Sequence, residues 1–180
     1  SGAPALFRLG DLDIAANAGF NASSRGFSLL GYDYRFTGPG AATSFGNGGS
    51  HGGKGGGSQS MSPYDYAYAP YQPGSAGKRS SASLGMGGGS IRISAENVNL
   101  AGQLLAKGQS NGGDGNAAGS GGSVWVTCES FTASETAKID AEGELPRTVD
   151  LIEAKQRSIG GGVKYSTGEG PVAEVFWEHR

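Results

Sequence analysis

The sequence predicts an all-β protein: a right-handed parallel β-helix, or solenoid, of about three rungs with a long ordered glycine-rich excursion. Glycine makes up 35 of the 180 residues, against a typical share of ~7%. Each glycine inside a helix costs about 1 kcal/mol relative to alanine, so helices should be scarce. The glycine-dense stretches alternate with compact β-type runs, and two of these runs repeat at a fixed spacing. Such a repeat is typical of solenoids.

The repeated unit holds three short strands with alternating apolar residues. In the first copy these strands contain Ile91, Val98 and Leu104. In the second copy, Val124 follows Ile91 by 33 positions and Phe131 follows Val98 by the same 33. One rung cannot bury its own apolar face, so neighbouring rungs must supply the rest of the core. We therefore expect the two copies to stack in parallel, strand upon strand.

The amino-terminal part fits the same pattern. Residues 6–15 predict two further strands, followed by a turn that reaches Gly19, as a third copy of the unit. The excursion then covers residues 37–90, and we expect it to be laid along the solenoid. Four of its glycines fall at every third position: Gly46, Gly49, Gly52 and Gly55. This spacing would suit polyproline II strands packed through glycine faces, but in a stretch so rich in glycine we favour coincidence.

The carboxyl-terminal part contains the one passage in which charged and apolar residues are mixed. We interpret residues 144–158 as an irregular insert. After it, the alternating runs at 163–165 and 172–177 predict two strands that could close the stack. On this interpretation residues 1–180 form a single β-helical domain.

Charge and hydropathy argue against several classes of protein. Fourteen basic and sixteen acidic residues give a net charge of −2, without the basic patch that nucleic-acid binding requires. No apolar run reaches the ~18 residues of a membrane span, so we expect no membrane insertion of this fragment. The first residues lack the charged and apolar regions of a signal peptide. We expect a piece of a longer protein with flanking domains.

Several glycine-rich motifs follow one another in a fixed order: GPG (38–40), GGSHGGKGG (48–56), an aromatic and proline stretch (63–73), GSAGK (74–78), GGGSIRI (87–93), GSGGSVWV (119–126) and AKIDAEG (137–143). This order resembles glycine-rich β-helical modules in large secreted or cell-surface proteins of bacteria, plants and protists. The resemblance implies a parallel β-helix, a secreted or cell-surface location and a structural, adhesive or glycan-contacting role. It implies no catalytic residues. The chain departs from the pattern after residue 143, where the insert precedes the next glycine run.

One segment concentrates aromatic side chains next to an acidic one. Aromatic rings beside polar groups can stack on sugar rings, and they are frequent contact anchors. Alternatively, these rings cover the flank of the solenoid where glycine leaves nothing to pack. In an extended segment, positions 64, 66 and 68 would share one face. The candidate glycan-binding residues are Tyr64, Asp65, Tyr66, Tyr68, Tyr71 and His51.

His51 lies between glycines, where it could act as a base or as a metal ligand. The only other histidine, His179, stands near the end of the chain, so no ligand set with a recognisable spacing exists. A hydrogen bond from the ring to backbone is the simpler interpretation. The run at 111–116, NGGDGN, is similar to a calcium-binding repeat but occurs once, which favours a turn. We expect neither a metal site nor a cofactor.

Three functions remain open. We favour a non-catalytic structural or adhesive module that contacts polysaccharide, or another surface or matrix component, through the tyrosine-rich segment. The first alternative is a polysaccharide lyase or hydrolase of the β-helix type, for which the available acids are Asp33, Asp140 and Glu142. Lys138 would point with Asp140, as on an ordinary solvated face. The second alternative is an ice-binding protein, although the threonines form no regular array.

Overall fold

The computed structural model describes residues 4–30, 35–58, 61–78, 85–109, 117–143, 157–166 and 170–179. The chain divides into two compact units, Ser1–Pro146 and Arg147–Arg180, and each is described by itself. Within the described ranges the secondary structure consists of β-strands, with no helix. The prediction of an all-β chain is confirmed.

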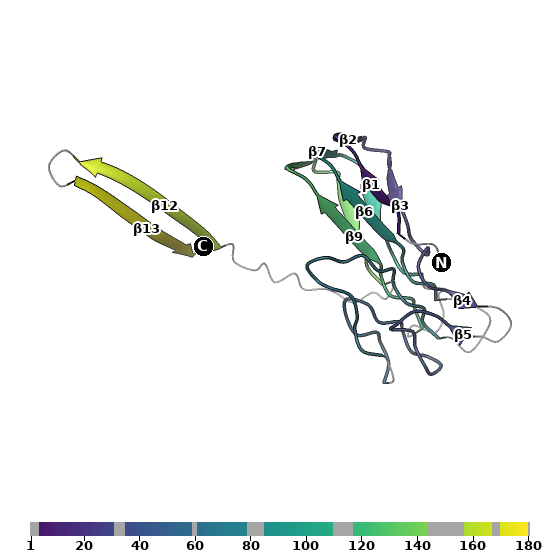
Figure 1. Ribbon diagram of the computed structural model, residues 1–180. Helices are drawn as coiled ribbons and strands as arrows, with labels where there is room; N and C mark the ends of the chain where they lie inside the picture. Colours follow the sequence, from purple (N-terminus) through teal and green to yellow (C-terminus); the bar gives the residue numbers. More distant parts are fainter. Residues whose placement is uncertain are drawn as a thin grey trace. The chain divides into compact units, whose positions relative to one another are not determined.

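The first unit contains three parallel sheets of three strands each (Figure 1). The sheets are β1 (Leu6–Arg8), β6 (Ser90–Ser94) and β9 (Ser123–Thr127); β2 (Asp11–Ile14), β7 (Asn97–Leu100) and β10 (Ser130–Ala133); and β3 (Gly19–Asn21), β8 (Gln103–Leu105) and β11 (Lys138–Asp140). The chain therefore visits the three sheets in turn and does so three times. We call these passes the first rung (β1–β3), the second rung (β6–β8) and the third rung (β9–β11).

The strand register confirms the repeat that the sequence predicts. Ile91 pairs with Val124, and Val98 pairs with Phe131, which are the partners at a spacing of 33. The amino-terminal copy is also confirmed, because β1 and β2 pair in parallel with β6 and β7. This copy has a third strand, β3 (Gly19–Asn21), which pairs with β8. The sequence predicted only a turn there.

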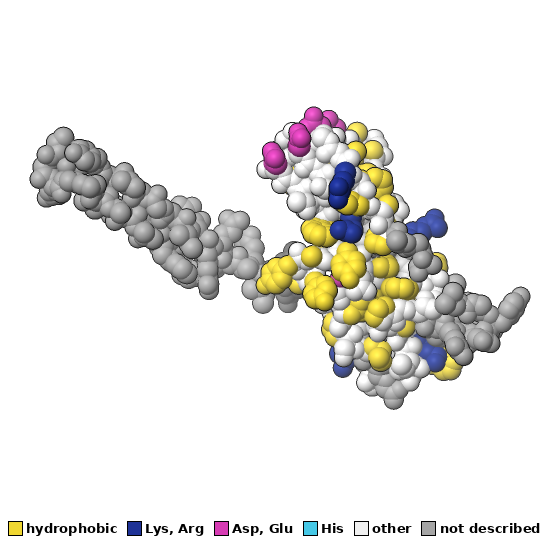
Figure 2. All heavy atoms as spheres, in the orientation of Figure 1, with side chains coloured by type: hydrophobic (Ala, Val, Ile, Leu, Met, Phe, Trp, Pro, Cys, Tyr) yellow, Lys and Arg dark blue, Asp and Glu magenta, His cyan; other side chains and the backbone are white. Residues whose placement is uncertain are grey.

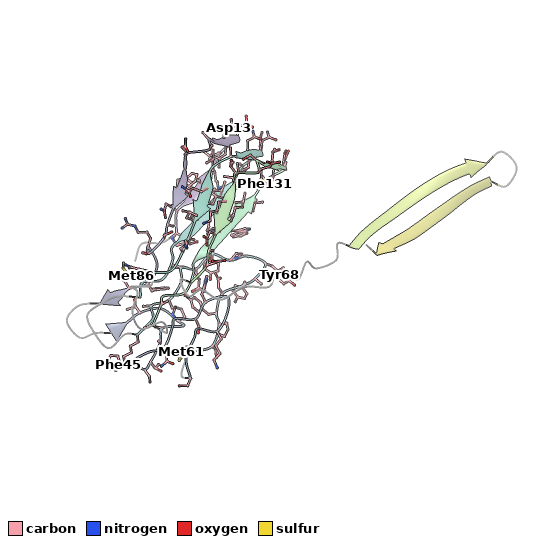
Figure 3. The ribbon with its side chains drawn as sticks, turned by 180° about the vertical axis from the view of Figure 1, so that it is seen from behind. Asp13, Phe45, Met61, Tyr68, Met86 and Phe131 are labelled. Carbon is pink, nitrogen blue, oxygen red and sulfur yellow. The ribbon has the colours of Figure 1, made fainter. Side chains whose placement is uncertain are left out.

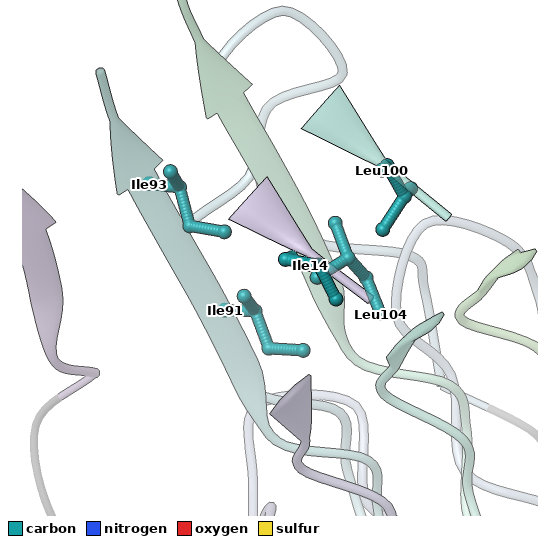
Figure 4. Packing of buried hydrophobic residues seen from close by; sticks show 5 residues of the cluster. All are labelled: Ile14, Ile91, Ile93, Leu100 and Leu104. Carbon is teal, nitrogen blue, oxygen red and sulfur yellow. The ribbon is translucent and has the colours of Figure 1, made fainter. Parts of the chain in front are cut away.

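The core lies between the three sheets, and its most deeply buried side chains belong to the second rung. Its buried side chains point toward one another from all three sheets (Figure 4). Val98, Leu100 and Leu104 are at most 2% exposed, because each has a parallel strand on both sides. Burial of such a side chain contributes about 1.5–3 kcal/mol. On the third rung, by contrast, Phe131 and Ile139 are 44% and 52% exposed.

Glycine-rich segments form the other end of this unit, where Figure 1 shows loops in place of arrows. Three of them hydrogen-bond to one another in a closed set. Gly74 N–H donates to Gly88 O at 2.8 Å, Gly88 N–H to Ser120 O at 2.9 Å, and Ser120 N–H to Ser75 O at 3.0 Å. In a flat sheet a strand bonds only to neighbours on two opposite sides, so these segments form a bundle.

Described parts of the excursion 37–90 bond to the third-rung segment that precedes β9. Gly49 N–H donates to Ala118 O at 3.0 Å. The glycines at every third position do not form one packed face. A Cβ at Gly49 or Gly55 would meet backbone oxygen at 2.3 Å, whereas a Cβ at Gly46 or Gly52 would meet nothing within 4 Å. The spacing is therefore better explained by coincidence.

A short antiparallel pair, β4 (Leu29–Leu30) and β5 (Arg35–Phe36), precedes the excursion.

The second unit contains an antiparallel hairpin of β12 (Arg157–Ser166) and β13 (Gly170–His179). The strands predicted at 163–165 and 172–177 lie inside β12 and β13, and they pair with each other. That they close the stack, and that residues 1–180 form a single domain, stay predictions. The predicted insert 144–158 lies outside the described residues except for its last two, which belong to β12.

Candidate functional site

The tyrosine segment, residues 63–73, is organised around the carboxylate of Asp65. Asp65 Oδ2 accepts hydrogen bonds from the backbone N–H groups of Tyr71 and Gln72, at 3.0 and 2.9 Å. Asp65 Oδ1 accepts one from Tyr66 N–H at 2.9 Å. Asp65 has a φ of 75°, in the left-handed region that Asp tolerates better than most residues. Its side chain is only 3% exposed, so the carboxylate serves the loop itself.

Ser123 joins this loop to the start of β9. Its Oγ lies 2.7 Å from the carbonyl oxygen of Gln72, to which it donates, and 3.3 Å from Asp65 Oδ2. Ser123 is buried, although it stands on the outer side of β9 by alternation with Val124. The tyrosine segment is thereby fixed to the first sheet.

His51 ties the same carboxylate to the glycine bundle. Its Nδ1 lies 3.0 Å from Gly121 O, and its Nε2 lies 3.2 Å from Asp65 Oδ2. A carbonyl and an ionised carboxylate can only accept, so both hydrogen bonds form together when both ring nitrogens carry protons. The ring is buried. The bond to Gly121 is the structural hydrogen bond to backbone that the sequence favoured.

Tyr64 points into the bundle. Its ring packs against His51 with centroids 4.8 Å apart. Its hydroxyl donates to Pro73 O at 2.5 Å and accepts from Ser75 Oγ at 2.8 Å. Burial, together with the negative charge of nearby Asp65, outweighs the hydrogen bond from Ser75 and raises the pKa of Tyr64 to about 12. Tyr64 is therefore a neutral structural anchor.

The pKa of Asp65 reflects competing effects. Burial alone would raise the pKa of this carboxyl. The backbone hydrogen bonds from Gln72 and Tyr66 and the interaction with His51 outweigh burial and hold the pKa below its ordinary value of 3.8. Asp65 is therefore ionised at neutral pH.

The remaining tyrosines of the segment face solvent. Tyr66 is 68% exposed, Tyr68 99% and Tyr71 40%, and Figure 3 shows Tyr68 projecting outward. The segment is not extended, because Ala69 N–H bonds back to Tyr66 O at 3.1 Å in a turn. The structure thus places the six candidate residues in one region, but they fall into two groups with different roles. His51, Tyr64 and Asp65 hold the loop, while the other three tyrosines are available to a ligand.

Asp140, one of the acids considered for catalysis, is paired with two lysines. Asp140 Oδ2 lies 3.1 Å from Lys138 Nζ and 3.9 Å from Lys107 Nζ. Burial would raise the pKa of Asp140, but a hydrogen bond from Glu142 N–H and the two lysines hold it below its usual range. Such a carboxylate is a poor general acid at neutral pH. Asp33 and the run 111–116 lie outside the described residues.

No group of three or more His, Cys, Asp or Glu side chains is placed to hold a metal ion within the described ranges. In the same ranges, no helix has the length and apolar character needed to cross a membrane.

Sequence reasoning missed the serines that fix the tyrosine segment. Ser75, Ser120 and Ser123 are all buried. Ser75 N–H donates to Ser120 Oγ at 2.7 Å, and Ser75 Oγ reaches Tyr64. Each serine stands in or at the end of a glycine-rich run. A serine within a glycine-rich run is therefore the sequence feature that could have identified these residues.

In comparisons with known proteins, no family model, no curated protein and no solved structure matches this chain.

Proposed function

We propose that this chain is a right-handed parallel β-helix module of a secreted or cell-surface protein, and that it acts as a non-catalytic adhesive or structural unit. In this proposal the exposed tyrosines contact polysaccharide, while the stacked rungs hold them in position. The three parallel sheets, visited in turn three times, support the architecture.

One observation carries the functional part of the proposal. The buried carboxylate of Asp65 fixes a loop from which Tyr66, Tyr68 and Tyr71 project into solvent. Exposed tyrosine rings are frequent contact anchors, and a loop whose backbone is already ordered loses little conformational freedom on binding. Aromatic side chains carried by such an ordered loop suit the flat apolar faces of sugar rings.

The test is binding to a glycan array by the wild-type chain and by the double variant Tyr66→Ala, Tyr68→Ala. The matched control is Phe45→Ala, because Phe45 is an equally exposed aromatic residue, at 63%, outside the tyrosine segment. We expect the wild type and the control to bind the same glycans and the double variant to lose at least about tenfold in affinity. Equal binding by all three proteins, or binding by none, would refute the proposal.

The enzyme alternative has its own readout in the same samples. A lyase would release unsaturated sugar ends, and a hydrolase would release reducing ends. We expect neither from any glycan that the wild-type chain binds.

A further inference from the structure

A second group of side chains lies on the outer face of the first sheet, beyond the tyrosine segment. Strand pairing places these residues in two rows across β1, β6 and β9. One row consists of Leu6, Arg92 and Trp125, and the next of Arg8, Ser94 and Thr127. These six residues, together with Ile93, line a pocket of about 200 Å³. Figure 2 shows basic side chains beside hydrophobic ones over these strands.

The two arginines of this pocket have no acidic partner within the described residues. The ion pairs found there involve His51, Lys107 and Lys138. The Nε of Arg92 is buried and has no hydrogen-bond partner in the described part of the chain. Since buried donors are nearly always paired, and a guanidinium is always charged, Arg92 has hydrogen-bonding capacity that the described residues leave unused.

The Arg92 guanidinium is also held in position. Its Cζ lies 4.8 Å from the centre of the Trp125 ring, a stacking arrangement that arginine favours. Arg8 stands one strand away and two residues further along, on the same face. Two cations in one pocket match an oxygen-rich anionic group, because guanidinium donors fit carboxylates and similar oxyanions in pairs.

The other pocket residues indicate what kind of molecule carries the anionic group. Trp125 and Leu6 supply apolar surface, while Ser94 and Thr127 supply hydroxyls. The pocket is smaller than the ~300–1,000 Å³ typical of drug-sized ligands, so it suits one ring. Figure 2 shows acidic side chains gathered at the end of the unit that carries β2 and β7.

We infer that this pocket is a subsite for an anionic sugar residue, one that carries a carboxylate or a sulfate. Arg8 and Arg92 bind the anionic group, Trp125 and Leu6 contact the ring, and Ser94 and Thr127 bond to its hydroxyls. The inference deepens the proposed function and rests on glycan binding. Ser123, which fixes the tyrosine segment, is two residues from Trp125 on the same side of β9. A chain seated in the pocket therefore continues toward the exposed tyrosines.

The experiment measures binding of the 180-residue chain to three oligosaccharides of similar length by calorimetry. The probes are an oligouronate, its uncharged methyl ester and a sulfated oligosaccharide. The variants are Arg8→Gln and Arg92→Gln, which remove the charge but keep the length of the side chain. Arg25→Gln is the matched control, because Arg25 is an exposed arginine outside the pocket. Circular dichroism verifies that each variant is folded.

We expect at least one anionic probe to bind at least about tenfold more tightly than the ester, and each pocket variant, but not Arg25→Gln, to lose about tenfold or more. The preferred anionic probe then distinguishes a carboxylate from a sulfate. Equal affinity for charged and uncharged probes would overturn the inference while leaving the proposed function intact. Failure to bind any of the three probes would overturn the inference, whereas the proposed function is overturned only if the glycan array also shows no binding. An acidic peptide and an oligonucleotide are titrated in the same way, and tighter binding of either, with the same dependence on Arg8 and Arg92, would overturn the assignment to a sugar.

Discussion

At the scale of single residues, Asp65 decides the conformation of the tyrosine segment. Its two oxygens accept three backbone hydrogen bonds and face the His51 ring. A carboxylate is suited to this role because both of its oxygens only accept. An amide at this position would place an N–H group against donors that already point inward. The loop that presents the tyrosines is therefore expected to depend on one charge.

We predict that Asp65→Asn destabilises the chain at neutral pH by about 1–3 kcal/mol. The folded-state pKa of Asp65 is below its ordinary value of 3.8. Ionised Asp65 therefore stabilises the fold above that pH, and this contribution is lost as the pH falls through the folded-state pKa. Denaturant unfolding at a series of pH values should show the wild type and the variant converging in acid.

The control for this prediction is Asp13→Asn. Asp13 is an exposed acid on β2 that accepts one hydrogen bond, from Asn99 Nδ2 at 2.6 Å, so only a small change is expected. A constant difference between wild type and Asp65→Asn across the whole pH series would contradict the assigned role of the charge.

At the scale of elements, the rungs differ in how deeply their apolar side chains are buried, and this difference can be tested by substitution. Leu104 on β8 and Ile139 on β11 are paired in register in the same sheet. Leu104 is fully buried, whereas Ile139 is 52% exposed. We predict that Leu104→Ala costs about 2–5 kcal/mol and that Ile139→Ala costs under about half as much. Denaturant midpoints of the two variants measure this, and equal losses would contradict a core centred on the second rung.

The glycine bundle depends on backbones that approach too closely for a side chain. A Cβ on Gly88 would lie 1.9 Å from Ala106 O and 2.5 Å from Gly122 N, both of which are backbone atoms that cannot rotate away. We predict that Gly88→Ala costs at least about 1–3 kcal/mol. Gly53→Ala is the control, since a Cβ there meets nothing within 4 Å. Thermal unfolding compares the two, and similar melting temperatures would mean that the bundle is loosely packed.

Strands were predictable where apolar alternation repeated at 33 residues, because register follows from the repeat. β3 was missed because Gly19, Phe20 and Asn21 hold one apolar side chain, too few to show alternation. The candidate site was predictable as a set of aromatic residues beside an acid. Which of these residues anchor the loop and which expose their rings could not be predicted. This division depends on the positive φ of Asp65 and on hydrogen bonds from serines far apart in the chain.

At the scale of the whole chain, the first unit contains its own sources of stability. Its core, its three parallel sheets and the closed set of bonds in the glycine bundle all lie within Ser1–Pro146. The second unit consists of one described hairpin, and isolated two-stranded hairpins are marginally stable in water. The two units are therefore expected to differ greatly when each is made alone.

We predict that residues 1–146 fold without residues 147–180 and unfold in one cooperative transition. A loss of 1 kcal/mol lowers the melting temperature of a chain of this size by about 2–4 °C, and we expect a change no larger than this. Circular dichroism melts of residues 1–146 and of the full chain make the measurement. The third rung leaves Phe131 and Ile139 partly exposed, so a much larger drop would mean that residues 147–180 cover such apolar surface. The strands of the hairpin would then close the stack, as the sequence predicts.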